Sequence, residues 1–173
     1  MSRQLLILRH GKSDPVAEAA ADFERPLAKR GFRDAPRIGH WMKKHDLTPD
    51  LILSSPALRA RQTVEAVADE LGVGRDQIRF DDRLYLASCD TLKQVLQEST
   101  ENIHRILIVG HNPGLEELLE SLADEPPPRN KKGKLLTTAA LGVLETDLTW
   151  QAMPGGQSRL RRIVYPRDLK QRK

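Results

Sequence analysis

The 173-residue chain lacks the features that mark several classes of protein. Its one cysteine, Cys89, cannot form an internal disulfide, which excludes a disulfide scaffold and favours a reducing compartment. Its apolar runs fall far short of the ~20 residues that cross a membrane, and Leu5 to Leu8 is too short for a signal peptide. Aromatic residues make up 4% of the chain, which leaves few stacking platforms for single-stranded nucleic acid. We therefore expect a cytoplasmic protein without a membrane span.

The composition is otherwise that of a globular protein. Hydrophobic residues make up 39% of the chain, which argues against a disordered protein, and the length fits one domain over residues 1–173. Lysine and arginine number 28 against 24 acidic residues, a formal net charge of +4. Much of this excess lies near the C-terminus, which ends in a basic tail over residues 167–173. Such a tail can bind nucleic acid, but we interpret it as a solubilising surface and expect no nucleic-acid partner.

Three short apolar runs predict strands that are buried on both faces, as in a parallel sheet. They are Gln4–Leu8, Leu51–Leu53 and Arg105–Val109. Between and after them, apolar residues recur at helical spacing over residues 38–45, 57–71, 91–97 and 115–122. Strands that alternate with helices predict parallel pairing through right-handed crossovers. Pro36 disturbs the first helical stretch, so that helix either begins near Asp34 or is kinked.

The last third of the chain has a different pattern. Three stretches predict strands, namely residues 139–146, 149–153 and 159–165. The proline-rich segment 124–134 predicts a flexible loop. We expect a three-layer, doubly wound α/β fold, with a mostly parallel sheet, helices on both faces and antiparallel C-terminal edge strands.

Polar residues follow each of the three apolar runs. The first run ends in Arg9-His10-Gly11, the second in Ser54-Ser55-Pro56 with Arg59 and Arg61 further on, and the third in the residues 110–114, GHNPG. Because ligands bind beyond the carboxyl ends of parallel strands, we expect these side chains to converge. Pro56 and Pro113 are predicted as first helical residues, with Ser55 or Asn112 as caps, so that two helix N-termini face one place. The ensemble predicts an anion pocket, and a phosphoryl group is its natural occupant.

A histidine in such a pocket is a suitable nucleophile. Neutral imidazole is abundant near pH 7, and attack of His10 on phosphorus would give a phosphohistidine intermediate that water hydrolyses. Arg9, Arg59 and His111 would then hold the phosphoryl oxygens, with Ser13 and Asn112 as further candidates. No histidine or cysteine pair has the spacing of metal ligands, so we expect no metal site.

Several segments together resemble the histidine phosphatase superfamily. LLILRHGKS, SSPALRARQT and VGHNPGLEELL resemble its three motifs in order, and RPLAKRG at residues 25–31 is similar to the small SixA-type phosphohistidine phosphatases. The resemblance implies a doubly wound sheet and no metal or organic cofactor. It implies that His10 is the nucleophile, that Arg9 and Arg59 bind phosphate and that His111 is the second histidine. Arg61 matches no catalytic position.

The chain departs from the larger members of the family at two positions. Leu86 stands where a glutamate acid is expected, which favours phosphoramidate substrates, because an alkoxide leaving group needs a positioned acid. Asp14, Asp22, Asp90 and Glu116 remain candidates for an acid supplied from elsewhere. Val16 replaces an asparagine of the broader family, and Ser13 or Lys12 are candidates for its oxygen contact.

The sequence predicts a cofactor-independent phosphatase that acts through phospho-His10. The partner we expect is a protein that carries phosphohistidine. Two alternatives stay open. The first is a phosphatase of small phosphorylated metabolites such as sugar or nucleotide phosphates. The second is a catalytically inactive module that binds phosphorylated partners or nucleic acid.

Overall fold

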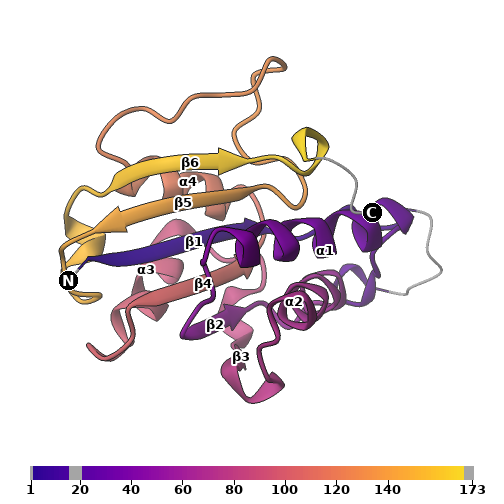
Figure 1. Ribbon diagram of the computed structural model, residues 1–173, viewed down its shortest axis with the longest axis horizontal. Coiled ribbons are helices and arrows are strands. Elements are labelled where there is room, and N and C mark those ends of the chain that lie inside the picture. The colour runs from indigo at the N-terminus through magenta and orange to yellow at the C-terminus, as the bar shows by residue number, and fades with distance from the viewer. Residues whose placement is uncertain (1, 16–20, 170–173) are drawn as a thin grey trace.

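A computed structural model describes residues 2–15 and 21–169 of the chain. Their centre is a six-stranded sheet with the order β3-β2-β4-β1-β5-β6 (Figure 1). The strands are β1 (Arg3–Arg9), β2 (Leu51–Ser54), β3 (Ile78–Phe80), β4 (Arg105–Gly110), β5 (Leu141–Thr146) and β6 (Arg159–Val164). The pairs β1–β4, β2–β4 and β2–β3 are parallel, whereas β5 is antiparallel to both β1 and β6. The predicted mixed sheet, with antiparallel strands added at its C-terminal edge, is confirmed.

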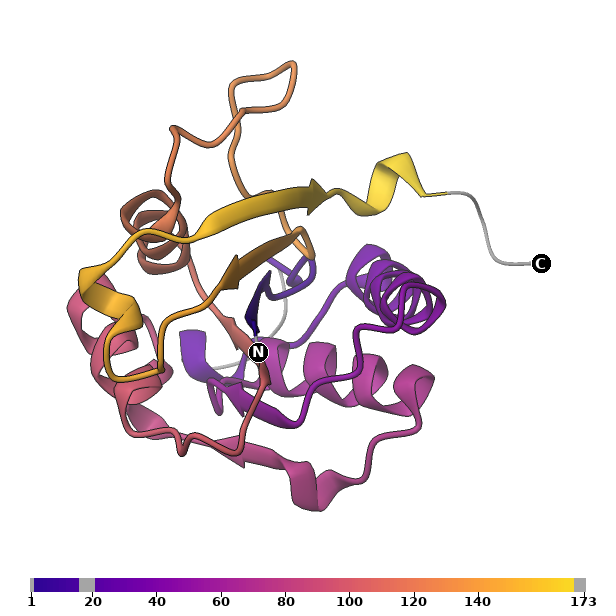
Figure 2. The same cartoon turned by 60° about the vertical axis from the view of Figure 1, so that its left-hand side comes forward.

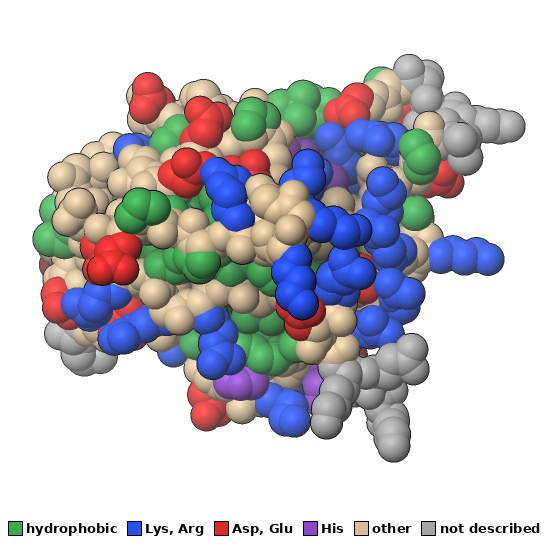
Figure 3. Space-filling view, turned by 90° about the horizontal axis from the view of Figure 1, so that it is seen from above, with side chains coloured by type: hydrophobic (Ala, Val, Ile, Leu, Met, Phe, Trp, Pro, Cys, Tyr) green, Lys and Arg blue, Asp and Glu red, His purple; other side chains and the backbone are tan. Residues whose placement is uncertain are grey.

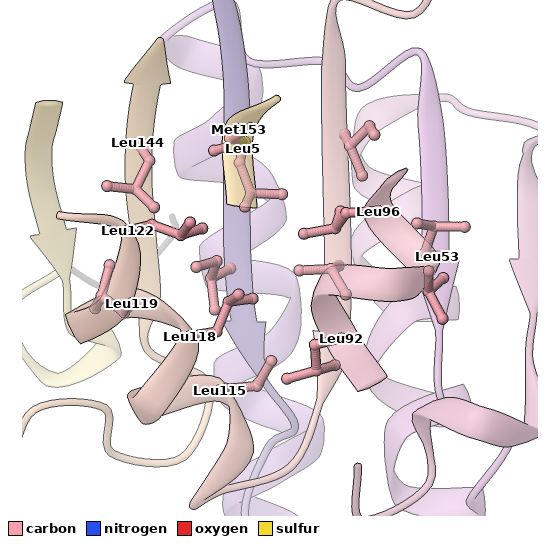
Figure 4. Packing of buried hydrophobic residues seen from close by; sticks show 14 of the residues in the cluster. Leu5, Leu53, Leu92, Leu96, Leu115, Leu118, Leu119, Leu122, Leu144 and Met153 are labelled. Carbon is pink, nitrogen blue, oxygen red and sulfur yellow. The ribbon is translucent and has the colours of Figure 1, made fainter. Parts of the chain in front are cut away.

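Helices cover both faces of the sheet. The α-helices of the described residues are α1 (Lys29–Lys44), α2 (Leu58–Leu71), α3 (Cys89–Gln97) and α4 (Gly114–Leu122). Leu6 and Leu8 of β1 pack with α1 and α2, while Leu5 and Ile7 pack with α3 and α4. Figure 4 shows Leu5 together with the leucines of α3 and α4 in this second cluster. Residues 5–8 of β1 and 106–109 of β4 are all 0% exposed, which explains why neither strand alternates in sequence. The predicted three-layer fold is confirmed.

Helix α1 begins at Lys29 and runs through Pro36, so of the two alternatives that the sequence left open, a start near Asp34 is wrong. The proline removes one hydrogen bond, to the carbonyl of Phe32, but Phe32 is half exposed. Tertiary packing compensates, because Ile38 and Met42 are buried and a Cβ at Gly39 would lie 3.1 Å from the Val67 Cα of α2. Close contact between α1 and α2 therefore outweighs the local cost of the proline.

Two other elements differ from the prediction. Residues 149–153 form turns and the start of a 3₁₀ turn (Met153–Gly155), and the strand predicted there is wrong. Trp150 is fully buried in this turn, and its Nε1 donates to the Ile103 carbonyl at 2.7 Å. Burial of the indole ring therefore fixes this segment as a turn, not as an edge strand. The short edge strand β3 was not predicted. None of its residues is buried, so its sequence contains no apolar run.

The segment between α4 and β5 loops away from the sheet and its helices (Figure 2). Residues 124–134 contain no helix or strand, as expected of the predicted loop, and their flexibility stays a prediction. Within the described ranges, no helix is long and apolar enough to cross a membrane. Most of the predicted basic tail, from residue 170 onward, and Val16 lie outside the described residues.

Candidate active site

The site lies at the carboxyl ends of three neighbouring strands. β1 lies beside β4, with Arg9 paired to Gly110, and β4 lies beside β2. His10 follows β1 and His111 follows β4, so the two ring centroids are 5.1 Å apart. Residues a hundred positions apart in sequence therefore meet because their strands are parallel neighbours.

His10 is held in one orientation by the backbone. The ring is 7% exposed and its Nδ1 lies 2.7 Å from the Gly11 carbonyl oxygen, a distance at which the Nδ1–H donates. Nε2 then carries the lone pair and faces the pocket. Burial lowers the pKa of His10 to about 3, with His111 and the arginines adding to this against the hydrogen bond to Gly11. The imidazole is therefore neutral near pH 7.

Gly11 allows the chain to turn closely behind His10. Its N–H donates to Thr63 Oγ1 at 2.9 Å, and a Cβ at Gly11 would lie 3.1 Å from the Cα of Gly31. The segment RPLAKRG thus packs directly on the loop that follows β1, where Ala28 N–H also donates to the Lys12 carbonyl at 2.8 Å. This packing gives the similarity at residues 25–31 a structural role.

His111 is fixed from the other side by Ser55. The ring is 4% exposed, with Nε2 at 2.8 Å from Ser55 Oγ and Nδ1 at 3.4 Å from an Arg59 nitrogen. Burial, and then the charge of Arg59, lower the pKa of His111 to about 4. Ser55 Oγ can accept from Nε2 or donate to it, so Nδ1 can either accept from Arg59 or donate to a ligand oxygen.

The helix starts differ from the prediction. Helix α2 begins at Leu58 and α4 at Gly114, so neither Pro56 nor Pro113 is a first helical residue. Neither Ser55 nor Asn112 caps a helix, because Ser55 Oγ contacts His111 and accepts from Ala57 N–H, and Asn112 Nδ2 donates to the Leu136 carbonyl. Both side chains are used by the site instead.

Arg59 connects the two histidines. It is 2% exposed in the first turn of α2, and its Nε lies 3.4 Å from His10 Nε2. Its terminal nitrogens donate to the carbonyl oxygen of Asp22 at 2.7 Å and to the Asp22 carboxylate at 2.9 Å. These bonds to Asp22 fix the guanidinium beside both imidazole rings.

Asp22, Tyr85 and Arg25 complete this side of the pocket. The Asp22 carboxylate accepts from Tyr85 Oη at 2.6 Å and from Arg25 at 2.8 Å. These bonds, with Arg59, hold the pKa of Asp22 well below its usual range, the hydrogen bond from Tyr85 being the largest cause. The Tyr85 ring also meets His111 edge-on, with centroids 5.5 Å apart. Asp22 was one of four carboxylates named from sequence, but the contact with Tyr85 had no sequence signal.

Arg9 also lines the pocket. It donates to the Leu136 carbonyl at 3.2 Å, and burial lowers its pKa. Among the described residues, Arg9 Nε and Asn112 Oδ1 are buried without a hydrogen-bond partner. Unsatisfied buried polar atoms are uncommon, and here they lie beside the pocket.

The pocket that these residues surround has a volume of about 390 Å³. It is lined by Arg9, His10, Lys12, Ser13, Asp22, Arg25, Arg59, Leu86, His111, Asn112 and Thr138. All six predicted site residues, Arg9, His10, Ser13, Arg59, His111 and Asn112, line it. Leu86 lies at the rim with 56% exposure, while Arg61 lies elsewhere with its guanidinium 4.6 Å from the centroid of the Phe80 ring.

The lining favours an anion. Four cationic side chains, Arg9, Lys12, Arg25 and Arg59, face one carboxylate, Asp22. Asp14 and Asp90 do not line the pocket, and Glu116 lines the neighbouring hollow, where its carboxylate accepts from Leu136 N–H at 2.9 Å. Within residues 2–15 and 21–169, no three His, Cys, Asp or Glu side chains are grouped as metal ligands.

Comparison with known proteins agrees with this geometry. The model of the histidine phosphatase superfamily (branch 1) matches residues 5–85. Phosphohistidine phosphatase SixA of Escherichia coli (strain K12) is 29% identical over 159 residues, which cover 87% of this chain and 94% of that protein. The crystal structure of a proposed phosphohistidine phosphatase SixA from Agrobacterium tumefaciens is 31% identical with a TM-score of 0.81, and covers 95% of this chain and 98% of that one.

A structure of the protein histidine phosphatase SixA complexed with tungstate is 27% identical, with a TM-score of 0.79 over 96% of this chain and 99% of that chain. Matches of this extent, in both sequence and structure, show that this chain belongs to the histidine phosphatase superfamily and is a phosphatase.

Proposed function

We propose that the enzyme transfers a phosphoryl group to Nε2 of His10 and then to water, and that its substrate is phosphohistidine on a protein. The observation that carries this proposal is the orientation of His10. Its Nδ1 is engaged by the Gly11 carbonyl at 2.7 Å, and its lone pair on Nε2 faces Arg59 and His111. A neutral, oriented imidazole among fixed cations fits nucleophilic attack on phosphorus.

In the first step, the Nε2 lone pair forms a bond to phosphorus while the bond to the leaving nitrogen breaks. The electron pair goes to that nitrogen, and the departing ring leaves as neutral imidazole after taking a proton. Charge on the equatorial oxygens is met by Arg9, Arg59 and a hydrogen bond from His111 Nδ1. In the second step, water attacks phosphorus and the bond to His10 breaks. Its electron pair returns to Nε2, and both protons of the water leave with the product, dihydrogen phosphate.

The preference for a phosphoramidate rests on the proton donors of the pocket. Of the described residues that line it, Asp22 is the one carboxylic acid, and its lowered pKa keeps it ionised at neutral pH. The Tyr85 hydroxyl already donates to Asp22, which raises the pKa of Tyr85. Because an alkoxide leaving group needs a positioned acid, this pocket suits a leaving group that can be protonated by solvent.

The test of the intermediate is His10→Ala. We expect the turnover of an aryl phosphate to fall by about 10³-fold or more, as for the loss of a nucleophile elsewhere. Rapid quenching of wild type in base should trap an acid-labile phosphoenzyme that the variant lacks. Circular dichroism should confirm that the variant is folded. A folded variant with unchanged turnover would remove His10 as nucleophile.

The test of the substrate is a comparison of kcat/KM. A phosphohistidine peptide should be hydrolysed with a higher kcat/KM than a panel of sugar and nucleotide phosphates. A sugar or nucleotide phosphate that exceeds the peptide would instead assign the enzyme to small phosphate esters.

A further inference from the structure

A series of connected hollows, which we call the basic groove, leads away from the pocket. The first hollow has a volume of about 350 Å³ and shares Arg9, Lys12, Asn112 and Thr138 with the pocket. The next, of about 450 Å³, shares Arg30, Lys134, Thr137 and Thr138 with the first. A third, of about 550 Å³, shares Asn130, Lys132 and Arg167 with the second. Figure 3, which views the molecule from above, shows Lys and Arg side chains gathered on one part of the surface.

The groove has more positive charge than its carboxylates can balance. Asp34 alone lies near three guanidinium groups, those of Arg30, Arg33 and Arg37, at 4.0, 3.2 and 3.9 Å. Glu116 is occupied by the backbone of Leu136, and Asp168 lies at the far end.

Four other cations of the groove lack such partners. Among the described residues, no carboxylate lies within ion-pair distance of these four side chains. They are Lys12, Lys132, Lys134 and Arg167. These side chains line the groove from the rim of the pocket to its far end, so an anionic partner would meet unpaired charge along its whole length.

We infer that the basic groove binds an acidic stretch of the protein whose phosphorylated side chain enters the pocket, an inference that rests on the proposed function. Three connected hollows extend beyond what one phosphorylated metabolite would fill, but they suit an extended polypeptide. The Thr137, Thr138 and Asn130 side chains supply hydrogen-bonding groups along its path.

Charge alone would also suit a nucleic acid, but the groove lacks stacking surfaces. Of the described residues that line it, Tyr165 is the one aromatic, and its hydroxyl is bound to the Leu135 carbonyl at 2.7 Å. Binding of single strands relies on rings that are free to stack. Carboxylate side chains, which need charge and hydrogen bonds alone, fit the lining better.

The experiment compares two phosphohistidine peptides that differ in one flank, which is rich in glutamate in one and in glutamine in the other. We expect wild type to prefer the acidic peptide by about tenfold in kcat/KM at low salt, with the preference reduced by added NaCl. In the double variant Lys134→Glu, Arg167→Glu, the ratio should fall to one or below. The matched control Lys43→Glu, Lys44→Glu reverses two exposed charges at the far end of α1 and should keep the wild-type ratio.

A ratio near one in wild type, or a preference that survives the reversal of Lys134 and Arg167, would overturn the inference. Failure of the proposed function has a different signature, since neither peptide would then be hydrolysed while an aryl phosphate still is. In that case binding of the unphosphorylated acidic peptide, measured by fluorescence anisotropy, decides. Binding that is lost in the Lys134→Glu, Arg167→Glu variant but kept in the Lys43→Glu, Lys44→Glu control supports the inference that the groove binds an acidic segment. Tighter binding of a single-stranded oligonucleotide of equal charge would assign the groove to nucleic acid instead.

Discussion

At the scale of single residues, the pocket consists of side chains that are fixed before any ligand arrives. Arg59 makes hydrogen bonds to both the backbone and the side chain of Asp22, and lies 3.4 Å from each histidine. A guanidinium that is already aligned needs little reorganisation as charge develops on the phosphoryl oxygens.

Replacing Arg59 by alanine should therefore lower kcat/KM on an aryl phosphate by about 10²–10³-fold, the scale for the loss of one oxyanion donor. Arg59→Lys should restore little, because one ammonium cannot reproduce the fork that contacts both histidines and Asp22. Arg61→Ala is the matched control, since Arg61 stacks on Phe80 outside the pocket, and it should keep the wild-type rate. Equal losses in the Arg59 and Arg61 variants would argue for an effect on helix α2 rather than on the pocket.

Asp22 places a negative charge against the guanidinium of Arg59. Asp22→Asn removes this charge, while the hydrogen bond from Arg59 to the backbone of residue 22 remains possible. We expect the inhibition constant of inorganic phosphate to fall several-fold, because the anion no longer faces a carboxylate. A loss of ester turnover by about 10²–10⁴-fold with unchanged phosphate inhibition would instead identify Asp22 as a proton donor.

The convergence of His10, Arg59 and His111 could be predicted because each lies beyond the carboxyl end of an apolar strand, and neighbouring parallel strands end at one edge of the sheet. The contacts of Asp22 with Tyr85, and of Ser55 with His111, could not be predicted. They depend on where loops of irregular conformation pass, which no periodicity in the sequence reports.

At the scale of elements, the start of α1 and the loop after β1 are packed backbone against backbone. A Cβ at Gly31 would collide with the Lys12 carbonyl oxygen and would lie 2.9 Å from Leu27 Cδ2. The position therefore requires glycine for space, not for backbone conformation.

Gly31→Ala should destabilise the protein by roughly 1–3 kcal/mol, the usual cost of overpacking, and should also lower kcat by moving the His10 loop. Urea denaturation measures the first effect and aryl phosphate turnover the second. Gly155→Ala is the control, because no atom lies within 4 Å of its added Cβ. An alanine at position 31 that is as stable and as active as wild type would show that the two backbones can separate at little cost.

The elements that sequence could not predict are those whose conformation is decided by tertiary contact. Helix α1 crosses Pro36 because its buried face packs on α2, and Trp150 is held in a turn by the core and by Ile103. Ala139 has a positive φ of 60° and its N–H donates to the carbonyls of Arg9 and His10, so β5 begins at Leu141 and not at the predicted position.

At the scale of the whole molecule, the two buried imidazoles link stability to pH. Their native pKa values, about 3 for His10 and about 4 for His111, lie below the ordinary value of 6.5. Between about pH 4 and 6.5 the unfolded chain therefore binds protons that the native protein does not. The two neutral histidines therefore make their full contribution to the free energy of unfolding above about pH 6.5. The free energy of unfolding falls as the pH is lowered through this window.

Urea denaturation near pH 7.5 and near pH 5 checks this expectation. In the double variant His10→Asn, His111→Gln, the difference between the two free energies of unfolding should be smaller than in wild type. An equal difference would mean that other groups cause the pH dependence. Signals of the His10 and His111 imidazoles in wild type that titrate near pH 6.5 would contradict the lowered pKa values directly.

The outermost strand β6 has a further consequence for the free molecule. Its backbone is paired on one side with β5, while Arg159, Arg161 and Arg162 are exposed along it. Arg159 and Arg161 both bind Glu145 of β5, and Arg162 lies over the ring of Trp41. A strand bordered by guanidinium groups repels an identical strand from another copy, which protects this open margin against self-association into larger sheets.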